Sequence, residues 1–140
     1  MRRRRDAESG VSAIEFVMLT PLAFLLILAT VQFALYMFSR HVAIAAAQEG
    51  ARVARTEQAT NGRWQQDATD KAATWVTQLG PSLTMPEAPQ ADLAGTVDGV
   101  QNVSMTVTVS VPAIIPWVGS FSVTEQSTGP IEQFVEDPNP

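Results

Sequence analysis

The feature that most constrains the fold is an apolar run from Phe16 to Phe38, which contains no charged side chain. As a helix this run would rise roughly 35 Å, enough to cross a hydrocarbon core of about 30 Å. Four arginines, Arg2 to Arg5, precede the run, and a single carboxylate, Glu15, lies at its start. We therefore predict one membrane-spanning helix, with its transmembrane part at about residues 16–38, and we interpret everything after residue 40 as attached to it.

A secretory signal peptide is the main alternative to a membrane span. The basic start fits it, and Ala45-Ala46-Ala47 offers small residues for cleavage. However, the run far exceeds the apolar region of a signal peptide, and Arg40 and His41 separate it from the alanines. The arginines and the polar bulk after residue 40 predict a basic cytoplasmic leader at 1–10 and a C-terminal domain outside.

Two residues interrupt the apolar run. Pro21 removes one helix hydrogen bond and crowds the preceding turn, so we predict a helix kink there. Gln32 is the second. It can hydrogen-bond a partner helix, but a long apolar helix also tolerates one glutamine without a role, and the sequence leaves both possibilities open.

The helix is expected to continue beyond the membrane, giving one long helix over residues 11–59. Its second half is rich in alanine, the best helix former. Two rows of small residues at spacing four would let another element approach closely, although alanine richness alone also produces such rows. The rows are Ala43, Ala47, Ala51 and Ala46, Gly50, Ala54. Glu49 and Arg52 can pair at i, i+3.

A small α+β domain is expected at residues 60–128. An apolar stripe predicts an amphipathic helix from Trp64 to Leu79, ended by Gly80-Pro81. Residues 80–99 suggest an irregular connection, and strict alternation predicts a strand over 103–111. A second strand near 121–124 would form an antiparallel hairpin or small sheet, with the amphipathic helix as its cover. Residues 129–140 are interpreted as an acidic flexible tail.

Composition argues against several classes of function. The chain has no cysteine and one histidine, which excludes disulfides, thiolate nucleophiles and a multi-histidine metal site in one chain. A net charge of −5 disfavours nucleic-acid binding. The carboxylate pairs Asp67/Asp70 and Glu132/Glu136 are typical of a solvated surface, and no phosphate loop or nucleophile elbow is present. We predict no catalytic, cofactor-binding or metal residue, no cofactor, no nucleic-acid partner and no small-molecule substrate.

Glu15 needs a partner because a carboxylate at the edge of hydrocarbon is costly. A cut after Gly10 would give Val11 a new α-amino group. That amine, on a neighbouring chain, is a cation that could pair with Glu15 in an assembly.

The segment Gly10-Val11-Ser12-Ala13-Ile14-Glu15-Phe16, after a short basic leader, resembles the processing site of class III (type IV-like) prepilins. Together with Pro21 and Glu49-Gly50-Ala51-Arg52, it resembles more closely the TadE/TadG-like minor pseudopilins of tight-adherence (Tad/Flp) pili, over roughly residues 5–60. This resemblance implies cleavage between Gly10 and Val11 by a prepilin peptidase. It also implies a processing and assembly motif at Glu15 and Phe16.

The partners that the resemblance implies are the membrane, the peptidase, other pilin or pseudopilin subunits and Tad assembly proteins. It implies a structural protein of the cytoplasmic (inner) membrane that is not an enzyme, and it allows incorporation into a surface pilus. Two departures stand out: Val11 leaves N-methylation open, and Gln32-Phe33 lies where family members often carry Glu-Phe. The alternative is an uncleaved single-pass membrane protein that exposes a small binding module and keeps Met1 or Arg2 at its terminus.

Overall fold

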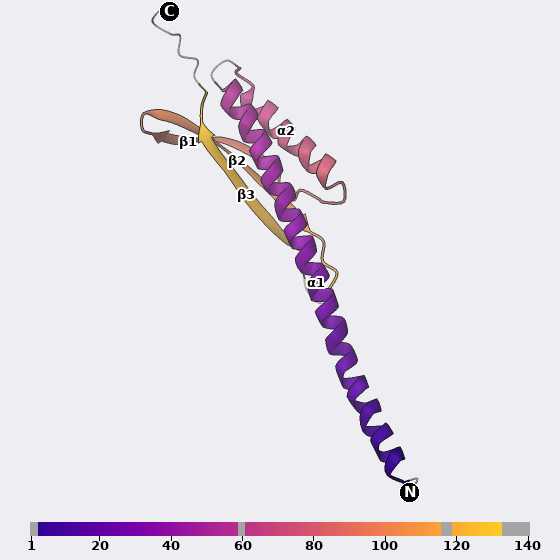
Figure 1. Cartoon of the computed structure of the whole chain (residues 1–140). Helices are drawn as coiled ribbons and strands as arrows, with labels where there is room; N and C mark the ends of the chain where they lie inside the picture. The colour runs from indigo at the N-terminus through magenta and orange to yellow at the C-terminus, as the bar shows by residue number, and fades with distance from the viewer. Residues whose placement is uncertain (1–2, 59–60, 116–118, 133–140) are drawn as a thin grey trace, which may run out of the picture.

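The computed structural model describes residues 3–58, 61–115 and 119–132, with side chains in the first helix from residue 13 onward. A long helix and a short helix precede three strands (Figure 1). Their bounds are α1 Arg3–Glu57, α2 Trp64–Leu79, β1 Gln90–Val97, β2 Val100–Val111 and β3 Phe121–Pro130. The strands form one antiparallel sheet in the order β1-β2-β3. The predicted α+β class is confirmed.

Helix α1 is continuous from the expected leader to the end of the alanine-rich stretch. It passes through Pro21 as one helix. The Thr20 hydroxyl donates to the Phe16 carbonyl at 2.7 Å, whereas the carbonyl that loses its donor to the proline ring is that of Val17. The kink at Pro21 stays a prediction.

Strand β1 is the element that the sequence interpretation missed, since residues 80–99 had been expected to be irregular. Asp98 and Gly99 connect β1 to β2 with positive φ angles of 52° and 81°. Two such residues in a row make the two-residue turn that matches the right-handed twist of a hairpin, and Asp-Gly is its preferred sequence. Val97 accordingly pairs with Val100 across the turn. The Asp-Gly pair was the overlooked signal.

The C-terminal half of α1, not α2, covers the apolar face of the sheet. Helix α1 packs against β2 and β3, whereas α2 packs mainly on α1 and reaches the sheet chiefly at β1 (Figure 1). The expectation that α2 covers the strands is therefore wrong. The alternation of β2 explains the choice: its inward side chains meet the alanine-rich face of α1, where small residues allow close approach. These are Val103, Met105, Val107, Val109 and Val111, all buried.

Both rows of small residues on α1 are buried inside the chain itself. Gly50 shows how closely the elements meet, because a Cβ added there would lie 2.5 Å from Met105 Cε and 3.1 Å from the Ala68 carbonyl oxygen. Helix α1 thus touches β2 and α2 at the same point. The rows are a packing face, and their partners in the structure are the sheet and α2 of the same chain.

Helix α2 begins and ends where the sequence predicts. Ala68, Ala72 and Val76 are its buried residues, and Trp64 and Trp75 pack against the core with part of their surface exposed. Asn61 organises the turn before it: its Oδ1 accepts from the Arg63 amide at 2.9 Å, and its Nδ2 donates to the carboxylate of Asp67 at 2.7 Å.

The sheet extends beyond the expected boundary at residue 128. Strand β3 includes Gly129 and Pro130, and Ile131 is buried. Proline is tolerated there because β3 is an edge strand and the residue lies at its end. The Ile131 amide donates to Gln101 O at 2.9 Å, and the Glu132 amide donates to Arg55 O at 3.1 Å. Residues 133–140 of the expected tail lie outside the described residues.

Candidate functional site

The first half of α1 projects from the domain as an uncovered rod, which we call the stem, residues 13–31 (Figure 1). Its large apolar side chains are exposed, with Phe16 at 70 % and Met18 at 74 %. None of the most apolar window of α1 is buried inside the protein. Water disfavours a continuous apolar surface of this extent, so the stem requires a membrane or protein partners.

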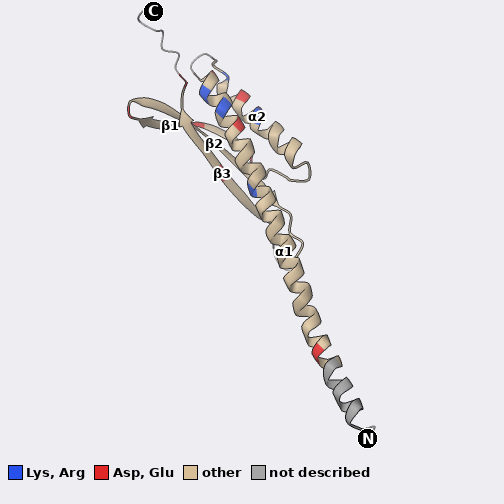
Figure 2. Cartoon of the chain, in the orientation of Figure 1, with Lys and Arg blue, Asp and Glu red and all other residues tan. Residues whose placement is uncertain are grey.

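The dimensions of the stem suit a bilayer. Residues 13–31 rise roughly 28 Å as an α-helix, close to a hydrocarbon core of about 30 Å. Figure 2 shows that charged residues gather where α1 lies beside the domain, whereas the stem is almost free of them. Glu15, in the first turn of the stem, is its single charged residue, and its side chain is exposed.

The predicted processing residues follow one another along α1. The Gly10–Val11 peptide bond lies in helical backbone, and the side chains up to residue 12 are outside the described set. Glu15 follows Gly10 by roughly 7.5 Å of helix rise. Phe16 is exposed beside Glu15. Helix α1 therefore carries the predicted cleavage position, the carboxylate and the apolar surface in that order.

The stem ends where Gln32 holds the loop between β2 and β3. Its Nε2 donates to the Pro112 carbonyl at 3.0 Å, and its Oε1 accepts from the Ile114 amide at 2.9 Å. Gln32 is 8 % exposed. The sequence had left open a partner helix or no role, and the structure gives the glutamine partners in a loop of its own chain. A polar residue in the apolar run was the signal, but partners 80 residues away could not be inferred.

A pair of charged residues lies two turns above Gln32. Arg40 Nε donates to Glu125 Oε1 at 2.8 Å, joining α1 to β3. This hydrogen bond and the negative charge of Glu125 raise the pKa of Arg40. On α1, Glu15 and Arg40 thus delimit the uncharged segment. The predicted Glu49–Arg52 pair is also present, at 3.0 Å.

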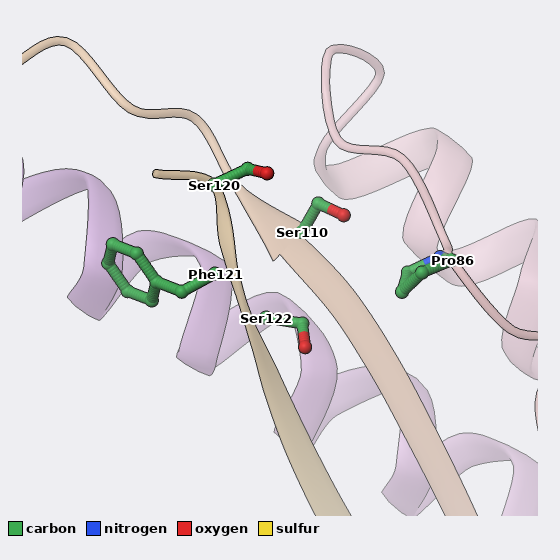
Figure 3. A pocket seen from close by; sticks show the side chains of 5 residues that line it. All are labelled: Pro86, Ser110, Ser120, Phe121 and Ser122. Atoms are coloured by element: carbon green, nitrogen blue, oxygen red, sulfur yellow. The ribbon is translucent and has the colours of Figure 1, made fainter. Parts of the chain in front are cut away.

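A shallow hollow of about 190 Å³ lies on the sheet near the ends of β2 and β3 (Figure 3). It is lined by Pro86, Ser110, Ser120, Phe121 and Ser122, and the Phe121 ring points away from it toward α1. Three hydroxyls with no acid or base in that lining cannot activate a nucleophile. Among the described residues, no group of three His, Cys, Asp or Glu is placed to hold a metal ion.

A long helix that is exposed and apolar in its first half and packed into a small α+β domain in its second half is typical of a single-pass, membrane-anchored protein. Residues 10–52 match the family model described as TadE-like protein. This segment of the chain, rather less than half of it, is therefore similar to TadE-like proteins. No curated protein and no solved structure matches the chain.

The matched segment has informative limits. It begins at Gly10, includes Glu15 and Pro21, and ends at Arg52 within the packed half of α1. Helix α2 and the sheet lie beyond it. The similarity to TadE-like proteins therefore lies in the stem and in the part of α1 that the domain covers.

Proposed function

We propose that the protein is a minor pseudopilin-like structural subunit of a tight-adherence pilus or a related secretion apparatus, processed by a prepilin peptidase. The observation that carries this proposal is the coincidence of the TadE-like match with the bare stem and its single carboxylate. The domain that follows the stem is larger than the short C-terminal part of a major pilin, which favours a minor component over a bulk filament subunit.

Cleavage falls between Gly10 and Val11. Apart from proline, glycine weakens a helix more than any other residue, by about 1 kcal/mol relative to alanine. Gly10 therefore lowers the cost of opening α1 locally for a protease. The cut removes the four arginines and leaves the α-amine of Val11 at the new end. This chain is the substrate in that reaction and supplies no catalytic group.

Glu15 acts in assembly. Its carboxylate lies near the end of the stem, where a cation at similar depth lowers the cost of its charge. The Val11 amine of a neighbouring processed subunit is that cation. Once stems leave the bilayer together, their exposed apolar side chains pack on each other and Glu15 sets the register.

The topology of this proposal is a single pass through the cytoplasmic membrane. The N-terminus lies inside, where the peptidase acts, and the α+β domain lies outside. Its partners are the peptidase, other pilin or pseudopilin subunits and Tad assembly proteins. The apolar stem supports this topology, because the same surface can anchor the chain in the membrane before assembly and pack against other subunits afterwards.

Two variants of the full chain test the proposal in cells that assemble the pilus. Gly10→Leu should block removal of residues 1–10, which intact-mass measurement detects. Glu15→Ala should be cleaved and inserted normally but incorporated poorly into filaments, because the assembly loses its charge partner. Glu87→Ala, an exposed carboxylate between α2 and β1, is the matched control and should assemble like the native protein. If Glu15→Ala entered filaments as well as the native protein does, the proposed salt bridge would be wrong.

A further inference from the structure

The loop between β2 and β3 is attached to α1 in an unusual way. A single buried side chain, Gln32, satisfies both a carbonyl and an amide of the loop backbone, those of Pro112 and Ile114. In water, the backbone groups of a loop need no such side chain because they form hydrogen bonds with the solvent. In hydrocarbon each unpaired group is costly, and irregular backbone persists only where the protein satisfies it.

The surroundings of these hydrogen bonds are apolar. No residue from Val111 to Phe121 is charged. The side chains of Phe33, Ile114 and Phe121 remain 61 %, 39 % and 37 % exposed. The Tyr36 ring lies between two of them, 6.5 Å from the Phe33 centroid and 6.3 Å from that of Phe121. The aromatic group thus joins β3 to α1 just above the stem.

The depth of this group follows from α1 itself. Glu15 and Arg40 are separated by roughly 37 Å of helix rise, between the thickness of the hydrocarbon core, about 30 Å, and that of the whole bilayer, about 40–45 Å. With these two charges at opposite headgroup regions, Gln32 lies roughly 12 Å below Arg40 along the helix. Because half of the core is about 15 Å thick, Gln32 then lies roughly 8 Å inside the hydrocarbon. Tyr36, roughly 6 Å below Arg40, lies near the margin of the core, where aromatic side chains are enriched.

We propose that the Pro112–Ile114 segment of the loop between β2 and β3 is a second membrane contact. The Pro112–Ile114 segment inserts into the hydrocarbon of the domain-side leaflet, with Phe33, Tyr36 and Phe121 facing lipid around it. Gln32 is a positioning residue that replaces the hydrogen bonds of water. Residues 116–118 lie outside the described residues and carry none of this argument.

This contact would hold the domain upright on the bilayer. A bare stem fixes the domain at one point only, whereas a second contact restricts its tilt and rotation. The inference rests on membrane anchoring by the stem and is independent of pilus assembly. The Arg40–Glu125 pair then lies in the headgroup layer, where both charges meet water.

The test uses the full chain in phosphatidylcholine nanodiscs with a nitroxide label at one introduced cysteine. The chain has no native cysteine, so every label is unique. Ile114→Cys reports the loop, Leu25→Cys reports the stem, and Thr96→Cys reports the far end of the sheet. The quantity measured is the ratio of collisions with dissolved oxygen to collisions with a water-soluble nickel chelate.

We expect the ratio at position 114 to be close to that at position 25 and well above that at position 96. A lipid-like ratio at 25 with a water-like ratio at 114 would overturn the loop contact while leaving the anchor in place. A water-like ratio at 25 would overturn the anchor and the inference together. This assay does not measure pilus assembly, which the Glu15→Ala variant tests separately. The two proposals can therefore fail independently.

Adding Gln32→Leu to the Ile114→Cys protein tests the positioning role. The loop should move toward water because its backbone groups lose their partners, so the ratio at 114 should fall toward that at 96. The ratio at 25 should not change in the same background. An unchanged ratio at 114 would contradict the role of Gln32.

Discussion

Among the glycines that the structure describes, Gly50 is the one whose added Cβ would meet its nearest neighbour at the shortest distance. A Cβ at this position would lie 2.5 Å from Met105 Cε, 2.9 Å from Met105 Cγ and 3.1 Å from Ala68 O. Carbon atoms pack favourably at about 3.5–4.0 Å, so the end of Met105 must retreat by about 1 Å. Met105 is fully buried, and the Ala68 oxygen belongs to the backbone of α2, so neither moves freely.

The expected loss of stability combines two opposing effects. Overpacking a core costs about 1–3 kcal/mol, whereas replacing a helical glycine by alanine gains about 1 kcal/mol. Gly50→Ala should therefore lower the free energy of unfolding by up to about 2 kcal/mol. Gly50→Val adds two more methyl groups and a β-branched side chain, and should cost about 3 kcal/mol or more.

The assay is denaturant unfolding of the full chain in detergent, followed by the fluorescence of Trp64 and Trp75, which pack against the core. Gly62→Ala is the matched control because a Cβ there meets nothing within 4 Å. A double-mutant cycle with Met105→Val sharpens the test: the shorter side chain should make Gly50→Ala less costly by about 1 kcal/mol. A gain in stability from Gly50→Ala alone, or strict additivity in the cycle, would refute the proposed close packing.

Two further predictions concern the domain. Gly99→Ala should destabilise it by about 1–2 kcal/mol because φ at this turn is +81°. The same unfolding assay measures this, and a loss no larger than that of Gly62→Ala would contradict the turn. Arg40→Gln should leave stability nearly unchanged, because the ion pair with Glu125 is solvent-exposed and screened by salt. A large decrease in the denaturant midpoint of unfolding that does not depend on salt would contradict the assignment of this ion pair as solvent-exposed.

Much of the fold could be predicted because local signals and tertiary packing agree. The stem follows from an uninterrupted apolar run, and α2 from a regular stripe bounded by Asn61 and Gly80. Strand β2 follows from strict alternation, which its burial reproduces between Met105 and Val111. In each case one side of the segment meets the same kind of surroundings along its whole length, so the residue pattern is regular.

The errors arose where position depended on distant parts of the chain. The assignment of α2 as the cover of the sheet failed because periodicity shows that a helix has an apolar face but not what that face meets. The alanine rows of α1 are buried, and β2 packs on α1 and hardly at all on α2. Strand β1 was missed because Gly95 and the prolines before it suggested irregular structure, although the Asp98-Gly99 turn was visible.

The candidate site divides in the same way. Gly10, Val11, Glu15 and Phe16 could be singled out because their spacing is local to one helix. Gln32 could be noticed but not explained, since Pro112 and Ile114 lie on a loop that only the folded sheet brings to α1. Long-range hydrogen bonds of this kind leave no periodic trace in the sequence.

The most direct test of the account is the intact mass of the native protein, purified from membranes of cells that contain the prepilin peptidase. Processing at the proposed bond predicts a chain that lacks residues 1–10 and begins at Val11. A mature chain that begins at Met1 or Arg2 would contradict the proposed processing and would support an uncleaved membrane protein with a small external binding module.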